Sequence, residues 1–223
     1  MKSKLEIACF HLESALLAQQ GGADRVELCQ DINCGGITPS YDTIKQAKEK
    51  LSIDLVIMLN PSGQTYIYSN SEFEVLKQNI SDLKQMGING FVFGILDETG
   101  DINKKKNKEL VELAHPLPCT FHRAFDKVNK PLDALEDIIE CGFKTILTSA
   151  QKTTAIEGIE LLAELVKKAN NRIIIMPGGG VRSSNISSLR EKLNTPFFHS
   201  SAITDNSEIA NLDEVKLLKS KLS

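Results

Sequence analysis

The chain has 223 residues, of which 41% are hydrophobic and 25% are charged, a composition typical of a globular protein with a full-sized core. Its 26 Lys and Arg residues against 29 Asp and Glu residues leave a formal charge of −3, which gives no basic surplus for nucleic-acid binding. The N-terminus lacks an uninterrupted apolar stretch, no segment reaches the roughly 20 apolar residues of a membrane span, and the cysteines form no disulfide framework. We therefore expect a cytoplasmic protein with no nucleic-acid or membrane partner.

Short apolar runs alternate with amphipathic stretches along the whole sequence. The apolar runs predict strands at 5–9, 25–29, 55–59, 90–94, 119–123, 145–149, 173–177 and 197–201. The stretches between them predict helices at 14–20, 41–51, 72–86, 107–114, 132–141, 156–169, 185–193 and 208–222. Strands that alternate with helices in this way form parallel sheets with right-handed crossovers.

Two architectures show this alternation, a closed (β/α)8 barrel and an open doubly wound sheet. The eight strand–helix units in 223 residues have about 28 residues each, which is a tight fit to the barrel. The open sheet usually has a G-x-G-x-x-G turn after its first strand, whereas residues 10–13 here read FHLE. Gly22, Gly87 and Gly142 precede three of the strands as a weak internal repeat. The sequence therefore predicts a single α/β domain over residues 1–223, a compact TIM-type (β/α)8 barrel.

In such a barrel the active site lies at the C-terminal ends of the strands and in the loops after them. Side chains alternate along a strand, so that one set points into the barrel and the other toward the helices. The predicted inward set of the first two strands is Glu6, Ala8, Arg25, Glu27 and Cys29, with apolar residues opposite.

Ionisable residues interrupt or follow strands that should be apolar. The candidates for acid–base catalysis at the strand ends are Glu27, His122, Arg123, Asp126 and His199. The segment 121–126 alone offers an imidazole as a base, a guanidinium as an anion clamp and an orienting carboxylate. The alternative is a structural network that plugs the barrel, in which an arginine neutralises the glutamates.

Glycines follow the seventh predicted strand, and serines end the eighth. Loops at these two positions of a barrel often bind phosphate or carboxylate through backbone N–H groups. Gly178, Gly179, Gly180 and Ser201 are therefore the candidate anion site. A plain tight turn would also accommodate three consecutive glycines, and this alternative stays open.

Cys29 ends the second predicted strand, and Cys34 follows it at a C-x4-C spacing. A structural zinc site would need two such pairs or a closer Cys/His set, so zinc is not indicated. A thiolate at a strand end is a candidate ligand for Cu(I), which prefers soft sulfur donors. The alternative is that each cysteine serves as a small buried hydrophobic residue.

Several strings together resemble the CutC family. They are GGADRVELC at 21–29, GG-x-TPS at 35–40, PLP-x-TFHRAFD at 116–126, LTS at 147–149, MPGGG at 176–180 and HSSA at 199–202. The likeness extends from Leu5 to about Ala202. It implies a (β/α)8-type barrel, a cytoplasmic location and a role in copper homeostasis, and a homodimer is expected by analogy alone.

Two departures from the family pattern bear on function. Family members proposed to bind Cu(I) use one cysteine at the end of each of the first two strands; the second matches Cys29, but the first falls at Ala8. Both arginines of the family string R-P-R are replaced, by Asn60 and Ser62, so that an anion clamped there in relatives would be held less firmly here. The positions of all five acid–base candidates match the family.

Two functions therefore stay open. The first is a copper homeostasis protein that binds Cu(I) through Cys29, with copper as its only cofactor. The second is an enzyme that acts by acid–base chemistry on a small anionic molecule at the C-terminal face of the barrel, where the glycine turn holds the anion.

Overall fold

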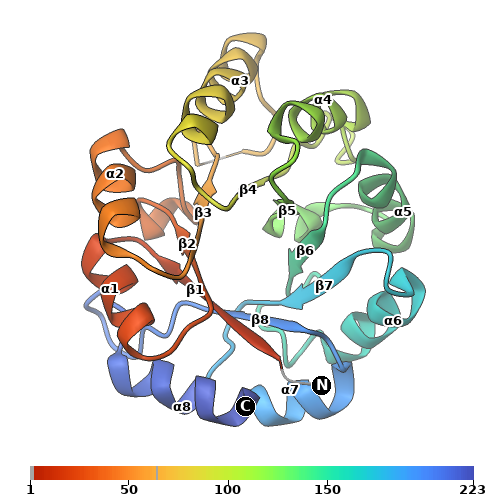
Figure 1. Cartoon of the computed structure of the whole chain (residues 1–223). Helices are drawn as coiled ribbons and strands as arrows, with labels where there is room; N and C mark the ends of the chain where they lie inside the picture. The colour runs from red at the N-terminus through yellow and green to blue at the C-terminus, as the bar shows by residue number, and fades with distance from the viewer. Residues whose placement is uncertain (1–2, 64) are drawn as a thin grey trace.

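A computed structural model of the protein describes residues 3–63 and 65–223, in which eight parallel strands alternate with eight α-helices (Figure 1). The strands are β1 (Lys4–Cys9), β2 (Arg25–Leu28), β3 (Asp54–Met58), β4 (Gly90–Phe93), β5 (Cys119–Phe121), β6 (Thr145–Thr148), β7 (Ile174–Pro177) and β8 (Phe197–Ser200). The helices are α1 (Leu12–Gln20), α2 (Tyr41–Lys50), α3 (Asn70–Gln85), α4 (Lys104–Ala114), α5 (Pro131–Cys141), α6 (Ile159–Ala169), α7 (Ile186–Leu193) and α8 (Leu212–Leu222). Two short 3-10 turns, η1 (Ile32–Cys34) and η2 (Arg123–Lys127), follow β2 and β5.

The strands form one sheet that curls into a nearly closed ring. Its hydrogen-bonded order is β7-β6-β5-β4-β3-β2-β1-β8, and all of its pairs are parallel. β8 also lies beside β7, which brings the two ends of the sheet together, while the helices form an outer ring (Figure 1). The expected single (β/α)8 barrel is thus confirmed.

Local backbone geometry decides where helices begin and end. The last helix, expected from residue 208, begins at Leu212, because Glu208 has a positive φ of 58° and the Asn211 side chain accepts a hydrogen bond from Glu214 N in the first turn. Gly142, a glycine of the internal repeat, ends α5 with a φ of 94°, a left-handed conformation that favours glycine. No helix in the described part of the chain is long and apolar enough to cross a membrane.

The strand side chains separate into an outer and an inner set, as the alternation predicts. The outer set of β1 and β2 packs against the helices and is fully buried: Leu5, Ile7, Cys9, Val26 and Leu28. Inside the barrel, Cys29 packs against Val56, Met58 and Val92 in a separate small cluster. Glu6, Ala8 and Glu27 are also buried on the inner side, so the barrel interior is polar on the side formed by β1 and β2.

Three phenylalanines form an aromatic cluster at the sheet on β4, on β5 and just before β6. The Phe143 ring lies 5.1 Å from the Phe93 ring and 5.3 Å from the Phe121 ring, and all three side chains are buried. Contacts of this kind add to the free energy gained by burying the rings themselves.

Removing the central ring of this cluster should destabilise the fold. For Phe143→Ala we expect the free energy of unfolding to fall by about 3–5 kcal/mol, because the substitution removes buried apolar area and leaves a cavity. Urea denaturation followed by circular dichroism measures the change. Leu217→Ala is the control: this side chain is 50% exposed on α8, so its loss should change the stability by less than about 0.5 kcal/mol. Equal effects of the two substitutions would contradict the role of the aromatic cluster.

Candidate functional site

A pocket of about 270 Å³ opens at the C-terminal face of the barrel. The sequence candidates that line it are Glu27, Cys29, His122, Arg123, Gly179, Gly180, His199 and Ser201. Asp126 and Gly178 lie behind residues of this lining. A pocket of this size suits a small metabolite rather than a macromolecular ligand.

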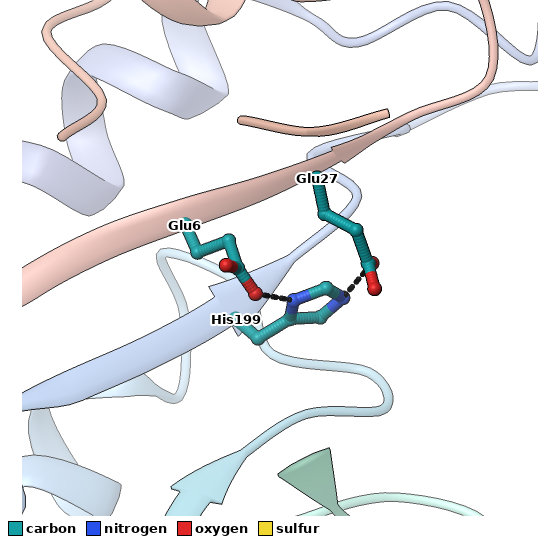
Figure 2. A group of neighbouring side chains, drawn as sticks. All are labelled: Glu6, Glu27 and His199. Atoms are coloured by element: carbon teal, nitrogen blue, oxygen red, sulfur yellow. Dashed lines mark hydrogen bonds and ion pairs between the residues drawn. The ribbon is translucent and has the colours of Figure 1, made fainter. Parts of the chain in front are cut away.

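The His199 ring lies between two buried carboxylates (Figure 2). His199 Nδ1 is 2.7 Å from Glu6 Oε1, and His199 Nε2 is 3.6 Å from Glu27 Oε2. The three residues come from β8, β1 and β2, where strand register places Glu6 beside both Arg25 and His199. The ring thus links Glu6, deep in the barrel, to Glu27 at the pocket.

The same region contains a structural ion pair. Arg25 pairs with Glu6 through its Nε, and its guanidinium carbon lies 4.3 Å from the centre of the Phe197 ring, a cation–π contact. Glu27 has no ion pair with Arg25, and within the described chain its Oε1 has no hydrogen-bond partner. The neutralising network considered from the sequence therefore accounts for Glu6 but not for Glu27.

The surroundings shift the pKa values of the two glutamates in opposite directions. Burial raises the pKa of Glu27 to about 7, with the charge of Glu6 adding to the rise and His199 opposing it. Burial also acts to raise the pKa of Glu6, but the positive charge of Arg25 and the hydrogen bond to His199 outweigh it and lower the pKa to about 2. Burial acts to lower the pKa of His199, whereas its contacts with Glu6 and Glu27 raise it above the usual value. Near neutral pH, Glu27 can therefore exist in both its protonated and its ionised form.

His122 faces the pocket as a neutral imidazole. β5 ends at Phe121, so His122 and Arg123 belong to the following loop and not to the strand expected at 119–123. Burial lowers the pKa of His122 to about 4. Its Nδ1 accepts a hydrogen bond from Ala124 N, which places the ring proton on Nε2, and Nε2 has no partner in the described residues. His122 therefore offers a donor to a ligand.

Asp126 holds the neighbouring arginine in place rather than facing the pocket. It accepts a hydrogen bond of 2.8 Å from Arg123 Nε, and it also accepts from the backbone N–H groups of Ser149 and Gln151, each at 3.1 Å. Arg123 in turn donates to Ser149 Oγ at 2.7 Å. With its oxygens occupied in this way, Asp126 is a positioning residue for Arg123.

The glycine turn after β7 fits closely against the acid–base residues. Gly178 N donates to Thr148 O, and a Cβ at Gly178 would lie 2.4 Å from Leu147 and 3.2 Å from the His199 ring. Gly179 and Gly180 have positive φ values of 92° and 65° and line the pocket. The turn thus requires glycine both for its backbone conformation and for its approach to the site.

Sequence reasoning did not assign three pocket residues to the candidate site: Asn60, which it named only as a departure from the family pattern, Tyr66 and Arg182. Arg182 comes two residues after the glycine string, a position that could have indicated it. Asn60, which stands where the family has an arginine, donates through Nδ2 to Gly36 O at 2.9 Å and so connects two loops. The Tyr66 ring packs edge-on against His122 at 4.8 Å between ring centres, and no sequence pattern indicated this contact.

Two sets of side chains bear on metal binding. Glu6, Glu27 and His199 bring three donor atoms within 4.8 Å of one another, but Arg25 already neutralises Glu6, and these oxygen and nitrogen donors are not the ligands that Cu(I) prefers. The soft donors at the pocket are Cys29 and Met58, which both lie against Gly36. Cys34 is only partly buried and is not among the residues that line the pocket.

The fold and the pocket define a (β/α)8 barrel protein with a small polar site at its C-terminal face. Residues 3–204 match the CutC family, and the chain belongs to that family. A human relative named copper homeostasis protein cutC homolog is 41% identical over 198 residues, which is 89% of this chain and 72% of the relative. A family protein CutC from Parabacteroides distasonis is 45% identical over 203 residues, or 91% of this chain and 84% of the relative.

Solved structures agree with the fold. The crystal structure of a putative copper homeostasis protein CutC from Streptococcus agalactiae superposes with a TM-score of 0.84 at 29% identity, covering 89% of this chain and 98% of that chain. Phosphoribosylanthranilate isomerase from Thermotoga maritima superposes with a TM-score of 0.67 at 14% identity, covering 99% of this chain and 98% of that chain, and shares only the barrel fold.

The glutamate pKa values can be checked directly. In carbon-13 NMR of glutamate-labelled protein, we expect one buried carboxyl group to titrate near pH 7 and to disappear in Glu27→Gln, while Glu6 stays ionised down to about pH 2. The raised pKa of Glu27 means that its protonated form favours the folded state, so its contribution to stability is lost as pH rises from the usual value of 4.5 through about 7. Glu27→Gln should therefore flatten the fall in stability over this range. A Glu27 that titrates near 4.5 would contradict the assignment.

Proposed function

We propose that this protein is an enzyme that acts by acid–base chemistry on a small anionic molecule at the C-terminal face of the barrel. The observation that carries the proposal is the buried Glu27–His199 pair, which faces a pocket of about 270 Å³ and leaves one Glu27 oxygen without a partner among the described residues. A buried, unpaired carboxylate oxygen costs folding free energy, and a ligand that donates a hydrogen bond or a proton would remove this cost.

The neighbouring residues supply the other parts of such a site. Glu27, with its pKa of about 7, is the proposed group that takes a proton from the substrate and returns it. Glu6 holds His199 through Nδ1, so that Nε2 is directed at Glu27. The N–H of His122 Nε2 is a neutral donor that polarises a substrate oxygen, and Arg123 contributes positive charge at the pocket wall.

Cu(I) handling is the second candidate function, and one observation favours it. Cys29 and Met58 place a thiol and a thioether in one cluster beside the pocket, and both atom types are Cu(I) ligands. The names of the human and bacterial relatives refer to copper homeostasis. Burial raises the pKa of the Cys29 thiol, so Cu(I) would have to displace its proton and should bind more tightly as the pH rises. Ala8 adds no second thiolate.

Proton abstraction can be tested before the substrate is known. The protein is incubated in deuterium oxide with mixtures of small carboxylates and phosphate esters, and deuterium incorporation is read by mass spectrometry. We expect incorporation into one compound class by the wild type and a loss of about 100-fold to 10,000-fold in Glu27→Gln, the range typical of a general acid–base group.

The matched control is Glu112→Gln, which changes an exposed glutamate on α4 that is not among the residues lining the pocket. This variant should exchange at the wild-type rate. The assignment of Glu27 is overturned if Glu27→Gln exchanges as fast as the wild type and if the rate is proportional to the concentration of each protein.

Copper binding is tested by anaerobic titration with Cu(I) against a competing chelator. If copper is cargo, the wild type should bind one equivalent, Cys29→Ser should lose it, and Ala8→Cys should bind more tightly because it adds a second inward thiol near Cys29. Cys141→Ser is the control, since this cysteine lies on α5, outside the pocket. Equal weak binding by the wild type and Cys29→Ser would eliminate the copper function.

A further inference from the structure

We propose that the anionic group of the substrate is a phosphate monoester, bound by the Gly179 and Gly180 amides and by Arg182 at the wall formed by β7 and β8. The inference rests on the proposed function, since it names the substrate class of the same pocket. Within the described chain it is carried by an unneutralised arginine, two free backbone donors and two buried polar atoms without partners in that pocket.

The charge of Arg182 has no counter-ion in the described chain. Its guanidinium donates to Val181 O and Ile203 O, both at 2.8 Å, and more loosely to Ser200 Oγ and Ser201 Oγ at 3.3 and 3.4 Å. None of these acceptors is charged, and no described carboxylate lies within ion-pair distance of it. The pocket wall therefore carries a fixed, partly buried positive charge that an anion would neutralise.

The glycine turn adds backbone donors beside this charge. Among the described residues, no protein acceptor receives a hydrogen bond from the N–H of Gly179 or Gly180, although both residues line the pocket. Their positive φ values belong to the type of turn in which successive N–H groups form an anion-binding concavity. A Cβ at Gly179 would lie 3.4 Å from the Arg123 guanidinium, so Arg123 also borders the turn, although Asp126 neutralises it.

A phosphate fits this donor set better than a carboxylate. Two amides and the guanidinium of Arg182 border the same pocket, and the several oxygens of a phosphate dianion can accept from all of them, whereas a carboxylate offers two oxygens. Ser201 can add its hydroxyl group, since it also lines the pocket.

The position of the turn determines where the carbon chain of the ester would lie, and the pocket volume limits its size. Gly178 approaches the His199 ring, so a phosphate on the next two residues would leave its attached carbon chain over the Glu27–His199 pair. The unpartnered Glu27 Oε1 and His122 Nε2 would then face this chain, one as an acceptor and the other as a donor. The pocket of about 270 Å³ restricts the ester to a compact one. The substrate class is therefore a small phosphate monoester with an oxygen function near the phosphate.

Binding of inorganic phosphate and of glycerol phosphate tests the site on the intact protein. In nitrogen-15 NMR, we expect the amides of Gly179 and Gly180 to shift on titration with either compound, and acetate to bind at least roughly tenfold more weakly. Calorimetry of Arg182→Gln should show a loss of at least about tenfold in phosphate affinity, as for the loss of a charged hydrogen-bond donor. Arg190→Gln is the matched control, because that arginine lies on α7 and donates to Lys221 O outside the pocket.

Each outcome decides the proposal. Absent shifts at Gly179 and Gly180, equal binding of acetate, or wild-type affinity in Arg182→Gln would each overturn it. The NMR titration of the wild type tests the phosphate site even where Arg182→Gln does not fold. If the Gly179 and Gly180 amides shift with phosphate in the wild type while Glu27→Gln retains full proton exchange, the acid–base function is rejected and the phosphate site stands.

Discussion

The burial of charge inside the barrel is the constraint on which the site depends. Glu6 has no solvent exposure and is stable there as an anion because Arg25 neutralises it from one side and His199 donates to it from the other. Removing Arg25 would leave the Glu6 carboxylate charged and unpaired in the interior, and this would lower the stability of the fold by several kcal/mol. The Glu6–Arg25 pair thus fixes the orientation of the His199 ring. The ring in turn is one of the groups that set the pKa of Glu27 at the pocket.

Two carboxylates with different surroundings then acquire different roles. Glu6 has a guanidinium beside it and a low pKa, whereas Glu27 lacks this partner and has a pKa of about 7. Pairs of titratable groups whose surroundings push their pKa values apart are typical of acid–base sites. The hydrogen-bond donors lie elsewhere around the pocket, with the neutral His122 and the charged Arg123 after β5 and the charged Arg182 after β7. In the proposed function, Glu27 therefore marks a proton-transfer region of the pocket, and the glycine turn with Arg182 marks a separate anion-binding region.

Much of this arrangement could be predicted from the sequence, because strand alternation and the barrel topology depend on local pattern. The inward direction of Glu6 and Glu27 follows from the apolar residues that flank each of them in its strand, and the glycine string after β7 indicated a turn that lines the pocket. The pairing of Arg25 with only one glutamate could not be predicted, since it depends on side-chain directions across neighbouring strands. The role of Asp126 was also hidden: hydrogen bonds from Ser149 and Gln151, over 20 residues away, decide that it faces the backbone. Arg182 was missed because its importance comes from the absence of a counter-ion in the described chain, which only the fold reveals.

Ala8, where the resemblance to the family implies a cysteine, separates the two candidate functions physically. In the β1–β2 register Ala8 pairs with Glu27, and its methyl group offers copper no ligand. Cu(I) binding would lose a soft donor at this position, whereas proton transfer by Glu27 needs only the burial that keeps its pKa high, which a methyl group provides as well as a thiol. The same substitution therefore weakens one function and leaves the other intact. The pocket lining brings together Glu27, two histidines and the glycine turn with a single thiol, and this donor set suits proton transfer better than Cu(I) binding, which is why acid–base chemistry is proposed ahead of copper handling.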